Sequence, residues 1–323
     1  MRDNLADEWA QVTRGHGREY LGLKCGIRGI DDLLNGWDGL ALLGAEPNIG
    51  KTVLLSQIGR GIVENDPGAA FVFFSFEMSV RSIMRREMVR ASTLPHRILL
   101  QGSTDIPRKE WPEAERLAYK AWNERDRTNA LAARDKASRD DTYRRTFVVG
   151  PEAVRSMHLH RREGLGPMRD IVEMAQASSG CERVFVGIDY LQRIPVDQSA
   201  ARSDLDRDER TMEAVHSFQR SLAHPVLAIA EFRKADFAKS GDARGSMADF
   251  AGSRRLAYSA DTLVTMTSAT ESDEPREAEL NGYMERVRDI DLRVLKARDG
   301  GHRGKVALEF VIERNLFREG KRK

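Results

Sequence analysis

The chain has 323 residues, of which 41% are hydrophobic and 32% charged, as is typical of a soluble globular protein. No run approaches the roughly 20 apolar residues that a membrane-spanning helix needs, and the N-terminal residues lack the apolar segment of a secretion signal. The cysteines, Cys25 and Cys181, show no metal-ligand spacing, which predicts reduced thiols in a cytoplasmic protein. The formal net charge of +2 does not by itself indicate nucleic-acid binding, although local basic clusters can still provide it.

Apolar strands alternate with helices along the chain. We expect strands at 40–43, 69–76, 146–149, 184–189, 226–230, 262–266, 292–295 and 306–312, the last followed by a short return through Leu316. The predicted helices run from Lys51 through Ile58 and over 79–90, 168–176 and 208–223, with Ser79 as an N-cap. This alternation predicts an α/β fold, with a mostly parallel sheet, helices on both faces and an antiparallel pair of strands at the end.

Two segments interrupt the alternation. Residues 107–145 are charged and rich in alanine, which predicts a helical insertion with a solvated charged face. Residues 269–288 are acidic and polar, and we expect an irregular, disordered loop there. The helical spacing of the first segment is carried by Trp111, Leu117, Ala118, Ala121 and Trp122.

Residues 44–52, GAEPNIGKT, lie between the first predicted strand and the helix that begins near Lys51. The start of a helix exposes unpaired N–H groups at the positive end of its dipole, which suits an anion. Gly50 lets the backbone approach a phosphate, Lys51 can reach the terminal phosphates, and the Thr52 hydroxyl can hold Mg²⁺. The segment predicts a phosphate-binding loop, although the strict pattern has glycine where Ala45 stands. The expected nucleotide contacts are Glu46, Pro47, Asn48, Ile49, Gly50, Lys51, Thr52 and Val53.

Two carboxylates follow buried strands. Asp189 ends VFVGID, and an open α/β sheet binds ligands at the carboxyl ends of its strands. Asp189 can hold Mg²⁺ through water, or it can be an ordinary residue that starts a turn. Glu77 follows FVFFSF on the expected neighbouring strand. It can orient and deprotonate an attacking water, or it can be a charge at the start of the next helix.

Lys296 and Arg298 leave a strand and enter the Gly-rich turn of LKARDGGHRG. Two cations at this spacing point to the same side of an extended strand. If the hairpin reaches the nucleotide of a neighbouring subunit, they can act there as a pair of arginine-finger type. The alternative is a solvated basic hairpin.

The segments GAEPNIGKT, FFSFEMS, GIDYLQRI and LKARDGGHRGKVALEF occur in this order. Together they resemble the C-terminal motor domain of DnaB-type replicative helicases, which belongs to the RecA-like ATPases. The resemblance runs from about residue 26 to about residue 318, and FSFEMS and IDYLQ are its most specific parts. The family often has alanine at the position of Ala45. The resemblance implies a RecA-like P-loop NTPase core over residues 26–323, with the helical insertion inside it.

The resemblance also implies roles for individual residues. Lys51 and Thr52 would bind the phosphates of ATP and Mg²⁺. Glu77 would be the catalytic base, and Asp189 the Walker-B carboxylate that helps to hold Mg²⁺. Lys296 and Arg298 would complete the site of the adjacent subunit.

Proteins of this family form six-membered rings whose channel loops grip one DNA strand by its phosphates. The matching loops here would be 195–207 and 235–247. Their candidate contacts to the phosphate backbone are Arg202, Arg207, Lys239 and Arg244. The alternative for each of these residues is a solvated loop charge.

The chain departs from the family pattern after the strand in AIAEFRK. Glu231 takes the place of the glutamine that senses the terminal phosphate, and Lys234, beside Arg233, takes that of the following arginine. A carboxylate near the γ-phosphate repels it unless Mg²⁺, a proton or a cation such as Lys234 compensates. The substitution therefore bears on how hydrolysis is coupled to strand movement.

Residues 1–25 form an extension before the motor, and we expect the family's N-terminal collar domain to be absent. Within 3–12, Leu5, Trp9 and Val12 form one apolar stripe. It indicates a short helix that packs on the next subunit, or else a frayed end.

The main hypothesis is a ring-forming, Mg²⁺-dependent ATPase that moves on single-stranded DNA, a minimal DnaB-type helicase with replication or mobile-element proteins as partners. The alternative is a DNA-responsive regulatory or loader ATPase that unwinds nothing, which Glu231 and the charged insertion favour. A third possibility is a nucleotide-switched protein-binding ring without DNA contact. Fold kinship alone does not decide among them.

Overall fold

The structure, a computed structural model, describes residues 19–45, 47–92, 128, 132, 140–157, 165–195, 203–231, 259–269, 274–280 and 283–320. Several predictions lie outside these residues: the N-terminal helix at 3–12, most of the insertion at 107–145, most of the loops 195–207 and 235–247, and the candidate residues Glu46, Arg202, Lys234, Lys239 and Arg244. Among the described residues, no helix is long and apolar enough to cross a membrane.

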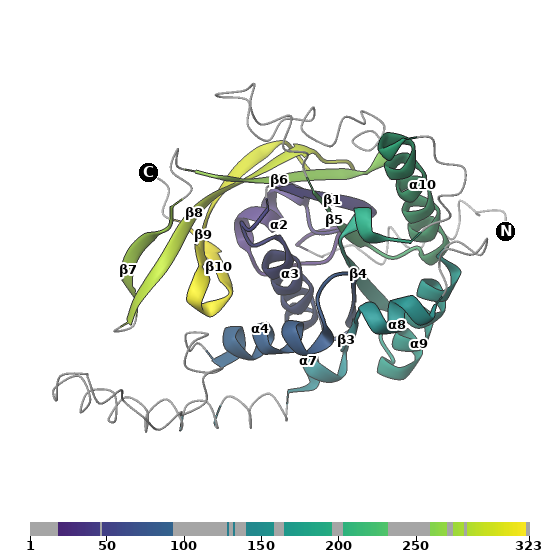
Figure 1. Cartoon of the computed structure of the whole chain (residues 1–323), viewed down its shortest axis with the longest axis horizontal. Helices are drawn as coiled ribbons and strands as arrows, with labels where there is room; N and C mark the ends of the chain where they lie inside the picture. Colours follow the sequence, from purple (N-terminus) through teal and green to yellow (C-terminus); the bar gives the residue numbers. More distant parts are fainter. Residues whose placement is uncertain are drawn as a thin grey trace.

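The described strands form one ten-stranded sheet in the order β10-β9-β8-β6-β1-β5-β4-β2-β3, with β7 paired to β8 (Figure 1). Strands β6, β1, β5, β4, β2 and β3 are parallel neighbours, whereas β7, β8, β9 and β10 add an antiparallel extension. The bounds are β1 Leu40–Ala45, β2 Ala69–Ser75, β3 Thr146–Val149, β4 Arg183–Asp189, β5 Val226–Glu231, β6 Thr262–Ser268, β7 Arg276–Leu280, β8 Tyr283–Lys296, β9 Gly304–Val311 and β10 Leu316–Glu319.

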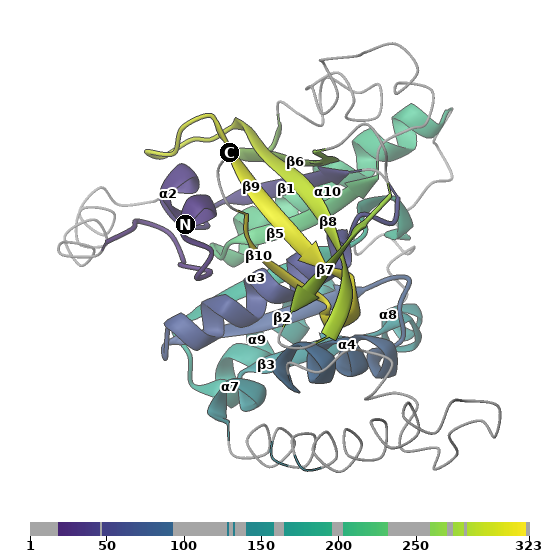
Figure 2. The same cartoon turned by 90° about the vertical axis from the view of Figure 1, so that its left-hand side faces the viewer.

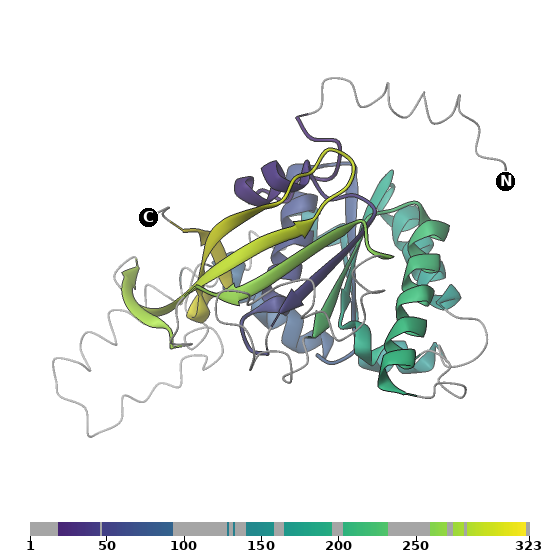
Figure 3. The ribbon, with the colours of Figure 1, turned by 90° about the horizontal axis from the view of Figure 1, so that it is seen from above.

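Helices cover both faces of the parallel part of the sheet (Figure 3). Residues of α2 and α3 pack on one face, and residues of α8, α9 and α10 pack on the other. The bounds are α2 Arg28–Leu34, α3 Lys51–Asn65, α4 Val80–Ser92, α7 Asp141–Arg144, α8 Pro151–Ser156, α9 Gly166–Ser179 and α10 Asp204–Leu222, with 3₁₀ turns η1 Leu191–Arg193 and η4 Ile312–Arg314.

The pleat of the strands separates two hydrophobic cores. In β1, Ala41 and Leu43 face the core under α3, while Leu40 and Leu42 face the core under α10. Successive side chains of a strand point to opposite faces, so a strand covered on both faces must be apolar throughout. All six residues of β1 are buried, as this arrangement requires.

Aromatic side chains fill the centre of the first core. The Phe71 ring centroid lies 5.8 Å from that of Phe73 and 5.9 Å from that of Phe185. Gly59 of α3 makes room for them, because a Cβ added there would stand 2.4 Å from the Phe71 ring carbons. A glycine at this helix position therefore brings α3, and the loop before it, close to the sheet.

The predicted mostly parallel sheet flanked by helices is confirmed. The last two strands, β9 and β10, are antiparallel as expected. Ser79 has the expected capping role, since its hydroxyl accepts a hydrogen bond from the Ser82 backbone N–H at 3.3 Å.

The expectation of an irregular loop at 269–288 is wrong. Most of its described part belongs to β7 and to the first half of β8, which pair antiparallel. The charges of these strands are matched by neighbouring strands: Arg276 meets Asp289 at 3.1 Å, and the buried Glu285 accepts from Arg314 Nε at 2.8 Å. Composition counts these charges but does not show that they pair across strands, and for that reason the segment resembles a loop.

The expected loop at 195–207 is also shorter than predicted. Helix α10 begins at Asp204, because the Ser203 hydroxyl caps it by accepting from the Asp206 backbone N–H at 3.1 Å. Arg207, a candidate DNA contact, therefore lies in the first turn of α10 rather than in a loop. The N-cap signal was present in the sequence but lies before the apolar stripe that marked the helix.

We expect Phe71→Ala to lower the free energy of unfolding by about 3–5 kcal/mol, because it leaves a cavity between Phe73 and Phe185. Met174→Ala is the control, since Met174 on α9 is 70% exposed and its loss should cost less than about 0.5 kcal/mol. Urea unfolding followed by circular dichroism measures both. Equal effects of the two substitutions would contradict the central place given to Phe71.

Candidate nucleotide-binding site

The parallel strands bring the candidate residues to one edge of the sheet. Ser75 pairs with Asp189 at the carboxyl ends of β2 and β4, and Ala45 pairs with Glu231 at the ends of β1 and β5. The phosphate loop follows β1 directly, and Glu77 lies two residues beyond β2. The edge that binds ligands in open α/β sheets thus carries the loop and three carboxyl groups.

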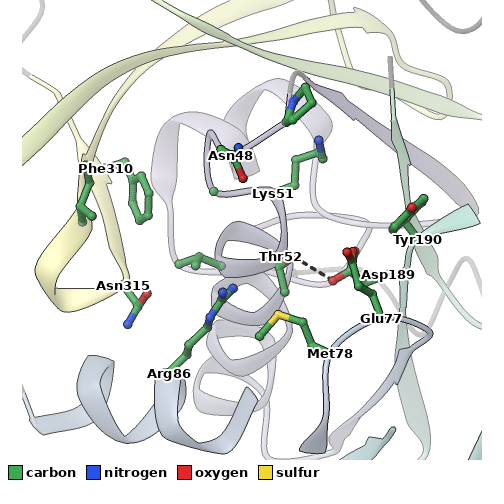
Figure 4. A pocket seen from close by; sticks show the side chains of 14 residues that line it. Asn48, Lys51, Thr52, Glu77, Met78, Arg86, Asp189, Tyr190, Phe310 and Asn315 are labelled. Atoms are coloured by element: carbon green, nitrogen blue, oxygen red, sulfur yellow. Dashed lines mark hydrogen bonds between the residues drawn. The ribbon is translucent and has the colours of Figure 1, made fainter. Parts of the chain in front are cut away.

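A cavity of about 480 Å³ opens at this edge (Figure 4). Its size lies within the range of ligand pockets, roughly 300–1,000 Å³. The loop and α3, the ends of β2 and β4, helix α4, and the β9–β10 turn all contribute to its walls. Its lining residues are Pro47, Asn48, Gly50, Lys51, Thr52, Val53, Glu77, Met78, Arg86, Asp189, Tyr190, Phe310, Ile312 and Asn315.

The phosphate loop has the backbone that its sequence predicts. Gly50, the N-cap of α3, has φ of 97°, a conformation that favours glycine, and a Cβ there would stand 2.9 Å from the Phe317 ring. The Lys51 ammonium donates to the Ala45 carbonyl at 2.9 Å. Ile49 is 3% exposed and lies in the core below the loop, so only its backbone is left to contact a nucleotide.

The Thr52 hydroxyl donates a hydrogen bond of 2.8 Å to the Asp189 carboxylate (Figure 4). Burial raises the pKa of Asp189 to about 6; Glu77 adds to this rise, whereas Thr52 and Lys51 oppose it. A buried carboxylate with a raised pKa lies where more positive charge would be favourable.

The donor set fits Mg²⁺. This ion prefers oxygen ligands and is held by one or two carboxylates together with waters and substrate phosphates rather than by an all-protein cage. Among the described residues, no group of three or more His, Cys, Asp or Glu side chains is placed to hold a metal. A hydroxyl and a single carboxylate beside a phosphate loop are consistent with a cation that arrives with a nucleotide.

The sequence interpretation missed Arg86 of α4, which lines the cavity (Figure 4). Burial lowers the pKa of Arg86, while the charges of Asp189 and Glu77 oppose that shift. A signal was available, because Arg86 stands one helical turn after the buried Ile83, on the side of α4 that faces the protein. A cation on a buried helix face usually has an anionic partner.

A second missed residue, Arg288 of β8, holds the phosphate loop from the antiparallel extension. Its guanidinium donates to the Asn48 carbonyl at 2.9 Å. Asn48 has φ of 64°, in the left-handed region, and this bond fixes the turn there. Nothing local in the sequence indicates the contact, because 240 residues separate its partners.

Lys296 and Arg298 lie at the opposite edge of the sheet. Lys296 pairs with Leu263 near the start of β6, and its ammonium donates to the Ala260 carbonyl at 2.5 Å. Arg298 forms an ion pair of 2.8 Å with Asp261, which also accepts from the Leu40 backbone N–H at the start of β1. One chain therefore brings Lys51, Thr52, Glu77 and Asp189 together and leaves Lys296 and Arg298 at the far edge.

Comparison with known proteins places this geometry in a family context. Residues 22–136, which contain the phosphate loop, Glu77 and Arg86, match the model of the DnaB-like helicase C-terminal domain. The solved ATPase domain of a DnaB-type helicase superimposes with a TM-score of 0.72 at 18% identity, covering 98% of this chain and 97% of that one. The chain has the fold of a DnaB-type motor domain.

A DnaB-like replicative helicase, solved in a study of its interactions with primase, gives a TM-score of 0.71 at 18% identity. That match covers 99% of this chain and 68% of the other. No curated protein matches the chain. The resemblance to DnaB-type motor domains, drawn from the four sequence segments, is confirmed.

We expect Arg288→Ala to weaken Mg-ATP binding by about tenfold, because losing one charge-assisted hydrogen bond of about 1.5 kcal/mol frees the Asn48 turn. Arg276→Ala is the control, since Arg276 lies in the same antiparallel extension but bonds only to Asp289 and Glu309. Isothermal titration with a non-hydrolysable ATP analogue compares the variants. Equal affinities would show that the contact does not shape the loop.

Proposed function

We propose that this chain is the ATP-hydrolysing subunit of a ring that moves along single-stranded DNA, a minimal DnaB-type helicase. The observation that carries the proposal is the separation of two half-sites. Lys51, Thr52 and Asp189 lie at one edge of the sheet, whereas Lys296 and Arg298 lie at the other. A pair of cations at that edge can reach a nucleotide only in another copy of the chain.

Residues around the cavity have chemical roles that follow from their positions. The loop N–H groups and Lys51 hold the β- and γ-phosphates, and bound Mg²⁺ neutralises charge on these phosphates. Glu77 is exposed at the cavity and orients and deprotonates the attacking water. Arg86, beside Glu77 and Asp189, offsets the negative charge that the phosphate brings.

Completion of the site in trans sets the form of the assembly. Contacts between opposite edges of identical chains are head-to-tail, and they close into a ring when the rotation between subunits permits. Arg298 would exchange Asp261 for the neighbour's phosphate. Because the Arg298 side chain is 54% exposed, this exchange needs little rearrangement.

Single-stranded DNA is proposed to pass through the ring. The candidate contacts Arg202, Lys239 and Arg244 lie outside the described residues, and Arg207 lies in the first turn of α10. Arginine and lysine contacts to phosphates give affinity that falls with salt and carries no sequence information. Glu231, at the end of β5 next to Ala45, supports the alternative of a loader or regulatory ATPase that uses ATP without unwinding.

A mixing experiment tests the shared site. We expect Glu77→Gln and Arg298→Ala each to lower ATP turnover by about 10²-fold or more while ATP binding persists. In mixed rings, some interfaces join an intact Glu77 to an intact Arg298, so the mixture should regain turnover that neither variant has alone. Arg303→Ala, on the same hairpin and exposed, is the control and should keep full activity. A mixture as inactive as its components would contradict completion in trans.

A forked-duplex assay separates the two candidate functions. The helicase predicts ATP-dependent strand displacement together with ATPase stimulated by single-stranded DNA, and Glu77→Gln should abolish both. Stimulated hydrolysis without displacement would instead identify the loader or regulatory ATPase. ATPase that single-stranded DNA leaves unchanged, with no salt-dependent DNA binding, would exclude both.

A further inference from the structure

The wall of the cavity away from Asp189 and Glu77 comes from the β9–β10 turn (Figure 4). It consists of Phe310, Ile312 and Asn315. A triphosphate held by Lys51 and Thr52 extends its nucleoside toward this wall. The inference that follows therefore rests on the proposed nucleotide site, and it concerns which base that site accepts.

Asn315 has an amide group without a protein partner. The residue is only 9% exposed, and its Nδ2 is buried without a hydrogen-bond partner among the described residues. A buried donor left unpaired costs free energy, and such groups in folded proteins usually have a partner. Because the amide lines the cavity, a ligand can supply the missing acceptor.

The turn that carries Asn315 is fixed to the helix that starts the phosphate loop. The Gln57 side chain of α3 donates to the Phe317 carbonyl at 2.7 Å and accepts from the Phe317 N–H at 2.8 Å. The Phe317 ring stacks on Phe310, with centroids 4.6 Å apart and planes 9° apart. Figure 2 shows β9 and β10 crossing in front of α3. The distance between the phosphate loop and the Asn315 amide is therefore set by the fold.

The backbone of Asn315 also limits where its amide can point. Its φ is 48° and its ψ 49°, in the left-handed region, and its N–H donates to the Ile312 carbonyl at 3.3 Å. Asparagine and glycine adopt this conformation most readily. Glycine would serve the turn equally well but has no amide, so the conformation alone does not require asparagine.

We propose that Asn315 recognises adenine and makes the site select ATP over GTP. A carboxamide pairs with the N7 and N6 edge of adenine, where its NH₂ donates to N7 and its carbonyl accepts from the N6 amino group. Guanine has two acceptors, O6 and N7, at that edge. The carbonyl of Asn315 would then face O6 without a hydrogen, so guanine cannot satisfy both groups.

The test compares the affinities of the full-length protein for Mg²⁺ complexes of non-hydrolysable ATP and GTP analogues by calorimetry. The wild type should bind the ATP analogue at least about tenfold more tightly, as one bidentate amide–base pair allows. Asn315→Gly keeps the left-handed turn and removes the amide, so the ATP-to-GTP affinity ratio should fall close to one. Asn315→Asp keeps the shape but exchanges the donor for an acceptor, so it too should weaken ATP binding.

Asn35→Gly is the matched control, because Asn35 is another asparagine with φ of 56° that lies at the end of α2, outside the cavity. Its affinity ratio should equal that of the wild type. Equal binding of both analogues by the wild type, or an unchanged ratio in Asn315→Gly, would overturn the inference and leave the proposed nucleotide site standing. Failure to bind either analogue would overturn the proposed function and the inference with it.

Discussion

The hydrogen bond between Thr52 and Asp189 joins the start of α3 to the end of β4. It exists because parallel strands present their carboxyl ends at one edge, where the loop after β1 meets the acid after β4. Thr52 hydroxyl, Asp189 carboxylate and the loop N–H groups thereby surround one point. The cavity, the cation that fits it and the direction in which a nucleotide must lie all follow from that point.

The antiparallel extension acts on the same point from outside the parallel core. Arg288 of β8 bonds to the loop at Asn48, and Phe310 and Phe317 of β9 and β10 pack where a Cβ on Gly50 would collide. Gln57 ties β10 to α3. The extension thus supports the loop, forms the wall that faces the nucleoside, and ends in the hairpin that carries Arg298 at the opposite edge. One structural unit serves two half-sites.

Charge balance explains the arrangement around the phosphates. Asp189 is buried and its pKa is raised, because neither Lys51 nor the nearby Arg86 fully offsets burial and the charge of Glu77. A cation arriving with a nucleotide would relieve this imbalance. At the other edge, Asp261 holds Arg298 and also bonds to the first residue of β1. A chain by itself therefore keeps its cations apart from the carboxylates that they would serve in a neighbour.

The sequence by itself determined the features that depend on neighbouring residues. Gly50, Lys51 and Thr52 had to follow β1, and Asp189 had to end a buried strand, because short spacings and apolar runs encode loops and strands directly. The tertiary structure alone decided which distant side chains reach the cavity. Arg86, Arg288 and Asn315 come from a helix face, a strand register and a left-handed turn, and the charges of 269–288 find partners only through pairing across strands. Those contacts join residues far apart in the chain, and no local pattern records them.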